Sequence, residues 1–356
     1  MNDQIRRVNL DGNGTETPVY VVAHLGLNHN GRASDARQLI RQADAAGADA
    51  VALPVYHTDA VVSEQAELAP GRREHVGELS ENPRNMLGRY ELAPETVHDL
   101  FAFAGERDLD VLPAPRDTES LSELSPDKRS GLLIEAGDLT FTPLVEACAD
   151  TGRPLLLSTG LHELDEVDRV MDHLSDTAPA GNLIPLYQAC CYPATVDDLD
   201  MRTLSKYVER YGTTVGFSDH TTGFQAAEMA VSLGAGVIVR HITLDRDADG
   251  PDHVIGLEPE RFHTCVRRIR DVENALGTGQ KAMSDTERQL RPYLLRSLAV
   301  RHSTEAGTSL EPEDLTALRP ADGIPLRRRS NVTGKQLNTD RKSGELLFPE
   351  DLERDS

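Results

Sequence analysis

Histidine side chains stand at the ends of short apolar runs in this sequence, where they could bind a metal ion. His220 and His241 each close such a run, and the two runs are consecutive along the chain. Imidazole nitrogens suit divalent ions such as Mn²⁺ and Zn²⁺. If the two runs are neighbouring strands, the rings lie about one strand spacing apart. The pair therefore predicts a metal site, and the alternative is that each ring is a hydrogen-bonded rim residue.

A third histidine, His24, closes the first apolar run of the chain. In a closed barrel of eight strands the first strand lies beside the last. His24 could then join His220 and His241 as a third metal ligand with one coordination position left open, or it could simply pack. The turn at 26–31 that follows is rich in Gly and Asn, and its backbone N–H groups and the Asn28 amide could contact a polar ligand.

The elements that must position these side chains follow a regular rhythm. Short apolar runs alternate with amphipathic segments from residue 18 to about residue 280, which predicts βαβ units and a parallel sheet. Eight runs favour a closed (β/α)₈ barrel, also called a TIM barrel. A doubly wound open sheet is the alternative, but no Gly-x-Gly-x-x-Gly turn follows the first run. The expected strands are 19–23, 50–54, 110–113, 131–134, 155–158, 183–187, 215–217 and 237–241.

Helices are expected between the strands, and residues 57–90 form a charged insertion that we expect to be irregular, either a lid or a flexible excursion. The expected helices are 33–46, 94–107, 142–151, 161–174, 224–233 and 258–276. The βα rhythm stops near residue 284, which predicts a second, small domain with short strands at 297–301 and 315–319. The predicted organisation is a polar N-terminal arm (1–17), a barrel (18–283), a linker (284–296) and a small domain (297–356).

The composition of the 356 residues limits the possible partners. The formal net charge is -22, which disfavours binding to nucleic acid or to anionic membranes. No apolar run approaches the roughly 18–20 residues that span a bilayer, and we expect a cytoplasmic protein with reduced cysteines. Few of the basic residues are lysines, and this acidic, lysine-poor composition favours a halophilic, high-salt setting.

The motifs that carry these residues resemble those of the sialic acid synthases and of the related legionaminate and pseudaminate synthases. The resemblance covers nearly the whole chain. The stretch around Arg319 is similar to the antifreeze-like (SAF) domain of that family, which is small and β-rich. The matching motifs are LGLNHNG (25–31), LSTG (157–160), VGFSDHT (215–221), HITLDRDADGPD (241–252) and LEP (257–259).

The resemblance implies a carbon–carbon bond-forming transferase. Phosphoenolpyruvate would add through C3 to the aldehyde of an N-acetylated hexose, water would attack C2, and phosphate would leave, giving a nonulosonic acid. The implied metal is Mn²⁺, with Zn²⁺, Co²⁺ and Mg²⁺ as alternatives. Arg319 would reach the partner's barrel in a domain-swapped homodimer. The other implied site residues are His220 and His241 for the metal, Asp252 as the acid at the reacting centre, and Ser158, Ser218 and Tyr192 near the substrates.

Several positions depart from the family pattern. Two lysines and several hydroxyl groups that hold phosphoenolpyruvate in the family are absent, and each lost charge-assisted contact is worth about 1.5–3 kcal/mol. The acid of the fourth-strand motif is shortened to Asp138, which we expect to be catalytic together with Asp252, and Arg116 could supply a replacement cation. The replaced positions are His24, Ala52, Ala114, Leu133, Ala136 and Cys190. The alternative hypotheses are a divergent member with lost or altered phosphoenolpyruvate chemistry, which binds a sugar or a metal or regulates a true synthase, and a scaffold without a ligand.

Overall fold

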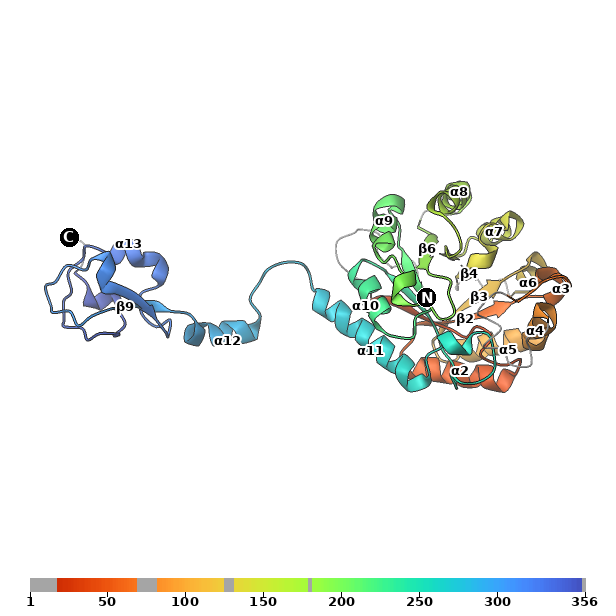
Figure 1. Cartoon of the computed structure of the whole chain (residues 1–356), viewed down its shortest axis with the longest axis horizontal. Helices are drawn as coiled ribbons and strands as arrows, with labels where there is room; N and C mark the ends of the chain where they lie inside the picture. The colour runs from red at the N-terminus through yellow and green to blue at the C-terminus, as the bar shows by residue number, and fades with distance from the viewer. Residues whose placement is uncertain (1–17, 69–81, 125–130, 179–180, 354–356) are drawn as a thin grey trace. The chain divides into compact units, whose positions relative to one another are not determined.

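Two compact units make up the chain, residues 1–279 and residues 280–356. The structure is a computed structural model, and it describes residues 18–68, 82–124, 131–178 and 181–353 (Figure 1). The N-terminal arm predicted at 1–17 lies outside the described residues. Each unit is described here by itself.

Eight parallel strands form the centre of the larger unit. Their order is β3-β2-β1-β8-β7-β6-β5-β4, and β3 and β4 also contact each other. The ring confirms the predicted (β/α)₈ barrel and rules out the open doubly wound sheet. The strands are β1 (Tyr20–His24), β2 (Ala50–Val55), β3 (Asp110–Pro115), β4 (Leu132–Ile134), β5 (Leu155–Ser158), β6 (Leu183–Gln188), β7 (Gly216–Asp219) and β8 (Val237–His241).

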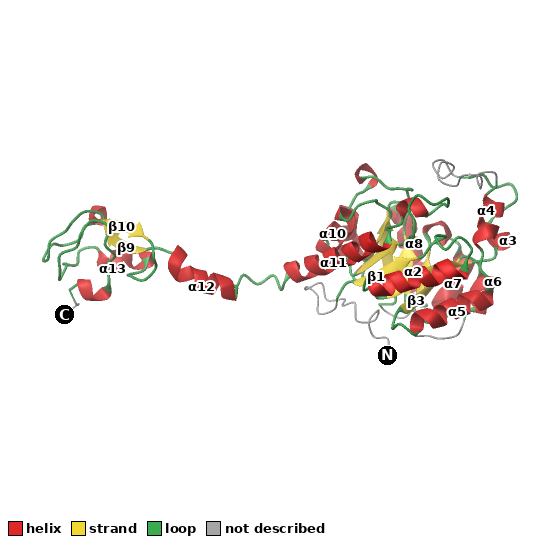
Figure 2. Ribbon diagram, turned by 90° about the horizontal axis from the view of Figure 1, so that it is seen from below, coloured by secondary structure: helices red, strands yellow, loops and turns green. Residues whose placement is uncertain are grey.

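Helices surround these strands (Figure 2). The six helices expected from the apolar rhythm are present, with ends that differ by a few residues. Two others, α6 and α9, were missed. In α9 the apolar residues Leu204, Tyr207, Val208 and Tyr211 follow the i, i+3, i+4, i+7 spacing of an amphipathic helix, so the sequence pattern could have found it. The helices are α2 (Ala33–Ala45), α5 (Pro94–Gly105), α6 (Thr118–Glu123), α7 (Thr142–Asp150), α8 (Leu164–Ser175), α9 (Arg202–Tyr211), α10 (Gln225–Ser232) and α11 (Pro259–Leu276).

The insertion after β2 is more regular than we predicted. It contains α3 (Thr58–Val61) and α4 (Pro83–Tyr90), while its residues 69–81 lie outside the described part of the chain. The expectation of irregular structure was wrong for α4, because Asn82 accepts hydrogen bonds from the first backbone N–H groups of this helix. Met86 and Leu87 then pack with Leu27 in a small apolar cluster.

Side chains that alternate along the strands build two different cores. One set fills the inside of the barrel, and the other packs between the strands and the helices. Ala52, Ala114 and Leu133 belong to the inner set and are almost fully buried. Three positions that depart from the family pattern therefore contribute apolar surface to the interior of the barrel.

A buried ion pair joins β7 to β8. Asp219 and Arg240 are register partners in the two strands, and Arg240 Nη1 lies 2.8 Å from Asp219 Oδ1 with both side chains almost fully buried. The same guanidinium also donates hydrogen bonds to the carbonyl oxygens of Asp219 and Thr221. Charges removed from water must be paired and hydrogen-bonded in this way to be tolerated.

The smaller unit has its own apolar core. It contains α12 (Asp285–Leu294), β9 (Ser297–Val300), β10 (Leu315–Leu318) and α13 (Arg329–Val332). β9 and β10 pair antiparallel, close to the two short strands we expected. Residues 284–296, predicted as a linker, are largely the helix α12, which begins at a capping box formed by Ser284 and Glu287.

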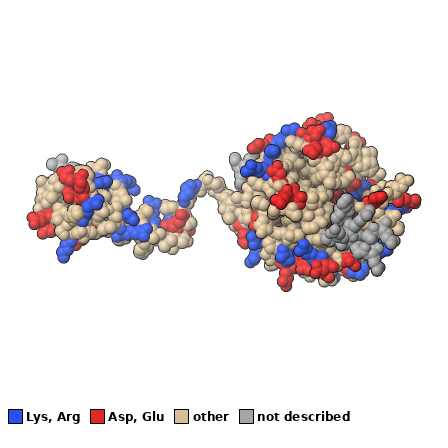
Figure 3. Space-filling view, viewed as in Figure 1, with Lys and Arg blue, Asp and Glu red and all other residues tan. Residues whose placement is uncertain are grey.

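The negative charge is concentrated in one unit. Counting the printed sequence, residues 1–279 have 24 Lys and Arg against 46 Asp and Glu, a net charge of -22, and residues 280–356 have 13 of each, a net charge of zero. On the face drawn in Figure 3, acidic and basic side chains are interspersed on both units. Among the described residues, no helix combines the length and the apolar character needed to cross a bilayer.

Removing Arg240 tests the importance of the buried ion pair. We expect Arg240→Met to lower the free energy of unfolding by about 3–5 kcal/mol, because the Asp219 carboxylate is left buried and unpaired. Arg169→Ala is the control, because Arg169 forms an exposed pair with Asp165 worth under about 0.5 kcal/mol. Urea unfolding followed by circular dichroism measures both. Equal stability of the two variants would contradict the assignment.

Candidate active site

A cavity of about 690 Å³ opens at the carboxyl ends of the barrel strands. In (β/α)₈ barrels this end carries the chemistry. The helices of the insertion contribute apolar side chains to the rim of the cavity, among them Val61 and Leu87. Every strand contributes at least one residue to the lining, either from the strand or from the turn after it: His24, Pro54, Arg116, Glu135, Ser158, Gln188, His220 and His241.

The two histidines predicted to bind a metal lie side by side in this cavity. The ring centroids of His220 and His241 are 5.1 Å apart, with an angle of 82° between the ring planes. Both side chains are buried. Because a divalent ion binds imidazole nitrogen at about 2.0–2.1 Å, rings at this separation are close enough to share one ion.

His24 lies beside them but uses its nitrogens differently. It is the register partner of His241 across β1 and β8, and the two ring centroids are 4.4 Å apart. Its Nδ1 accepts a hydrogen bond of 2.9 Å from the Gly26 N–H. Its Nε2 lies 3.4 Å from a carboxylate oxygen of Glu135. The predicted position beside β8 is observed, and both nitrogens face protein groups.

Asp252 reaches the same cluster from the loop after β8. Its Oδ2 accepts a hydrogen bond of 3.0 Å from the Leu27 N–H. Gly26, which has a φ of +50°, makes this approach possible, since a Cβ there would lie 2.7 Å from Asp252 Oδ2 and 2.9 Å from His241 Cδ2. The Gly-rich turn therefore lets a carboxylate and an imidazole meet against bare backbone.

His253 ties this loop to the same turn. Its Nδ1 lies 2.7 Å from Thr243 Oγ1 and its Nε2 lies 3.0 Å from Asn30 Oδ1. Asn28, a predicted substrate contact, donates a hydrogen bond to the Ile242 carbonyl and is absent from the described lining of the cavity. Both side chains hold the turn after β1 against the end of β8.

The remaining predicted contacts of the barrel gather around the two histidines. Tyr192 packs edge-on against His220 at 4.9 Å between centroids, and Ser158 and Ser218 line the cavity as buried residues. Gln188, which we did not predict, lies 2.9 Å from His220 through the two Nε2 atoms. It directly follows the expected sixth strand, so the rule that selected the other residues could have found it.

Arg116 forms ion pairs with two carboxylates that follow β4. Its Nε donates a hydrogen bond of 3.1 Å to Asp138 Oδ2 and lies 3.9 Å from Glu135 Oε2. Although burial opposes its charge, the Glu135 and Asp138 carboxylates raise the pKa of Arg116. Burial raises the pKa of Asp138 in spite of Arg116. Glu135 was missed, although it directly follows the predicted fourth strand.

The described residues include no group of three His, Cys, Asp or Glu side chains arranged to hold a metal. The metal prediction therefore rests on the His220 and His241 pair beside Asp252, and His24 stays a prediction as a third ligand. Arg319 is exposed in the smaller unit, where its Nε donates a hydrogen bond to the Leu294 carbonyl.

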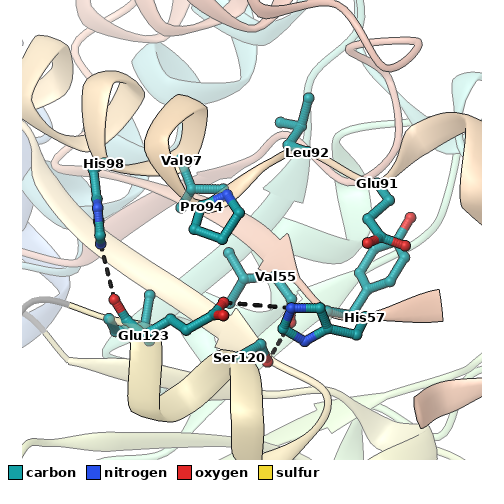
Figure 4. A pocket seen from close by; sticks show the side chains of 11 residues that line it. Val55, His57, Glu91, Leu92, Pro94, Val97, His98, Ser120 and Glu123 are labelled. Carbon is teal, nitrogen blue, oxygen red and sulfur yellow. Dashed lines mark hydrogen bonds and ion pairs between the residues drawn. The ribbon is translucent and has the colours of Figure 1, made fainter. Parts of the chain in front are cut away.

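A second cavity lies beside β2 and measures only about 30 Å³ (Figure 4). His57 lies there between Asp117 at 3.3 Å and Glu123 at 3.4 Å, and His98 Nε2 lies 2.9 Å from the Glu123 carbonyl oxygen. A space of this size holds only a few water molecules. It is too small for a sugar or for phosphoenolpyruvate.

The fold and its mouth define a (β/α)₈-barrel enzyme. Residues 39–281 match the NeuB family, and the chain belongs to that family.

Its relatives include synthases of nonulosonic acids. The chain is 31% identical over 352 residues to an N,N'-diacetyllegionaminic acid synthase of Legionella pneumophila, covering 98% of this chain and 99% of the relative. It is 27% identical to the N-acetylneuraminate-9-phosphate synthase of Mus musculus, covering 96% and 95%. A crystal structure of an N-acetylneuraminic acid synthetase from Leptospira borgpetersenii, in complex with citrate, aligns with a TM-score of 0.67 at 26% identity, covering 78% of this chain and 91% of that one.

His29, in the turn after β1, gives the structure a testable pH dependence. Burial lowers its pKa to about 4, whereas an unfolded chain has a pKa of about 6.5. As the pH falls from about 6.5 to 4 the unfolded chain gains a proton that the folded chain does not, so His29 removes on the order of 3 kcal/mol of stability in this window. Above about pH 6.5 the contribution vanishes.

We therefore expect His29→Asn to flatten the loss of stability between pH 6.5 and 4. Urea unfolding at several pH values measures it. His173→Asn is the matched control, because His173 is exposed and pairs with Glu146 on the surface, and it should keep the slope of the unsubstituted protein. The assignment fails if His29→Asn keeps that slope as well.

Proposed function

We propose that this NeuB-family enzyme condenses phosphoenolpyruvate with an N-acetylated hexose to give a nonulosonic acid and phosphate. In this reaction C3 of phosphoenolpyruvate forms a bond to the aldehyde carbon, water adds to C2, and the C2–O bond to phosphate breaks. The observation that carries the proposal is the convergence of His220, His241 and Asp252 in a cavity large enough for both substrates. The relatives named as nonulosonic acid synthases support it over nearly the whole chain.

A divalent ion, with Mn²⁺ as the first choice, fits the donor set of His220 and His241. Bound there, it would polarise the aldehyde oxygen of the sugar. Asp252 is held beside His241 by the Leu27 N–H, where its carboxylate can take a proton from the water that attacks C2. Ser158 and Ser218 offer hydroxyl donors to the anionic groups of phosphoenolpyruvate.

The second unit completes the proposal. We assign it as an antifreeze-like domain that delivers Arg319 to the N-acetyl group of the sugar in the partner's barrel, within a domain-swapped homodimer. The motif around Arg319 and the independent apolar core of this unit support the assignment. We place the enzyme in a cytoplasm of high salt, in keeping with the net charge of -22 on residues 1–279.

One observation favours the second candidate function, a family member with altered phosphoenolpyruvate chemistry. Leu133 and Ala136 line the cavity, and Ala52 and Ala114 lie in the apolar interior of the barrel. Apolar side chains at these positions offer no charge to a phosphate group. Turnover separates the two candidates, since only an active synthase releases phosphate.

The test is phosphate release from phosphoenolpyruvate with Mn²⁺, in high salt, across a panel of N-acetylated hexoses. We expect release that depends on a sugar of the panel, and a nine-carbon keto acid in the mass spectrum. His220→Ala should lose turnover and weaken Mn²⁺ binding by roughly a hundredfold or more, measured by metal analysis after dialysis. His173→Ala is the surface control. Folded protein that releases no phosphate with any sugar would favour the second candidate.

Mixing two inactive variants tests the domain swap. His220→Ala disables the barrel and Arg319→Ala removes the arginine proposed to act in the partner's barrel. A mixed dimer would then contain one complete site, so random exchange of subunits should restore about a quarter of the native turnover. Each variant alone should stay inactive. If Arg319 acted within its own chain, mixed dimers would contain no complete site and mixing would restore nothing.

A further inference from the structure

Arg116 is the one Arg or Lys side chain in the described lining of the cavity. Three carboxylates, those of Glu67, Glu135 and Asp252, line the same cavity. The wall therefore repels an anion unless the anion reaches the guanidinium directly. The binding of an anionic substrate therefore depends on the contacts that Arg116 already makes with the protein.

The two carboxylates beside Arg116 are not equivalent. Asp138 accepts a hydrogen bond from Nε at 3.1 Å, whereas Glu135 Oε2 lies 3.9 Å from the same atom, too far for a hydrogen bond to it. Asp138 has 13% of its side chain exposed and Glu135 has 28%. In the part of the chain that the structure describes, Nε makes the one side-chain hydrogen bond of Arg116, which leaves the donors of the two terminal nitrogens for a ligand.

Glu135 also has a second partner within reach. Its Oε1 lies 3.4 Å from His24 Nε2 while its Oε2 faces Arg116. If Glu135 leaves Arg116, its carboxylate can keep its contact with His24, and it stays within reach of water because 28% of its side chain is exposed. Asp138 meanwhile keeps the guanidinium in place. The exchange of Glu135 for an incoming anion therefore leaves no group of the cluster unpaired.

We propose that Glu135 is an internal counterion of Arg116 that phosphoenolpyruvate displaces, and that Glu135 thereby limits the affinity of the site for this anion. The proposal rests on the proposed function for the identity of the anion. A carboxylate or phosphate group of the substrate takes the place of Glu135, with two N–H donors of a fixed guanidinium plane. Glu135 is thus a specificity-determining residue that admits only anions able to replace it.

The test is calorimetric titration of the full chain with phosphoenolpyruvate, in the presence of Mn²⁺ and without a sugar. Glu135→Gln keeps the shape of the side chain and removes its charge, so we expect the Kd to fall by about tenfold. Glu67→Gln removes a charge from another part of the same wall and should change the Kd by less than about threefold. Arg116→Gln should abolish measurable binding, and thermal melts check the fold of each variant.

The outcomes separate this inference from the proposed function. Unchanged or weaker binding by Glu135→Gln, or equal tightening by Glu67→Gln, overturns the displacement, and Glu135→Ala repeats the test if the Gln variant does not fold. If the protein releases phosphate with a sugar while Glu135→Gln leaves the Kd unchanged, only the inference fails. If neither the unsubstituted protein nor Glu135→Gln binds phosphoenolpyruvate and no phosphate is released, both fail.

Discussion

The buried ion pair of Asp219 and Arg240 determines where the candidate active site can form. These residues pair across β7 and β8, and each directly precedes one of the two histidines of the mouth. Because side chains alternate along a strand, placing Asp219 and Arg240 behind the barrel wall directs the histidines that follow them toward the cavity. A slip of one residue would turn a histidine away from the cavity and turn a charged side chain into it, so the ion pair specifies the register on which the metal site depends.

The contacts of the turn that follows β1 also depend on this register. Gly26 allows Asp252 and His241 to approach the backbone at a distance that no side chain would permit. His253 then connects the loop after β8 to Asn30. The site is therefore assembled from neighbouring strands and from two loops that hold each other in place through hydrogen bonds. These contacts bring residues that are distant in the sequence into one small volume.

The sequence was sufficient for the barrel and for most of the residues that end its strands. Apolar runs report burial directly, and the ends of parallel strands meet at one face of the barrel, so His24, His220 and His241 could be placed together before the structure was known. The helices α4 and α9 were missed although each has apolar residues at helical spacing, because strongly polar residues stand between these positions. Glu135 was missed because its importance arises from two partners, His24 and Arg116, that lie far away in the sequence.

Apolar side chains in the lining of the cavity strengthen the electrostatic interactions of Arg116. Leu133 belongs to the inner core of the barrel and also lines the cavity that contains Arg116. Apolar neighbours exclude water and lower the local dielectric, so a charge interaction above them is stronger than the same interaction in solvent. That holds for the attraction of Arg116 to a substrate anion and equally for its attraction to Glu135. A single guanidinium in a cavity with such a lining can therefore replace part of the binding that several solvated cations would share, provided that the competing carboxylate can move to His24.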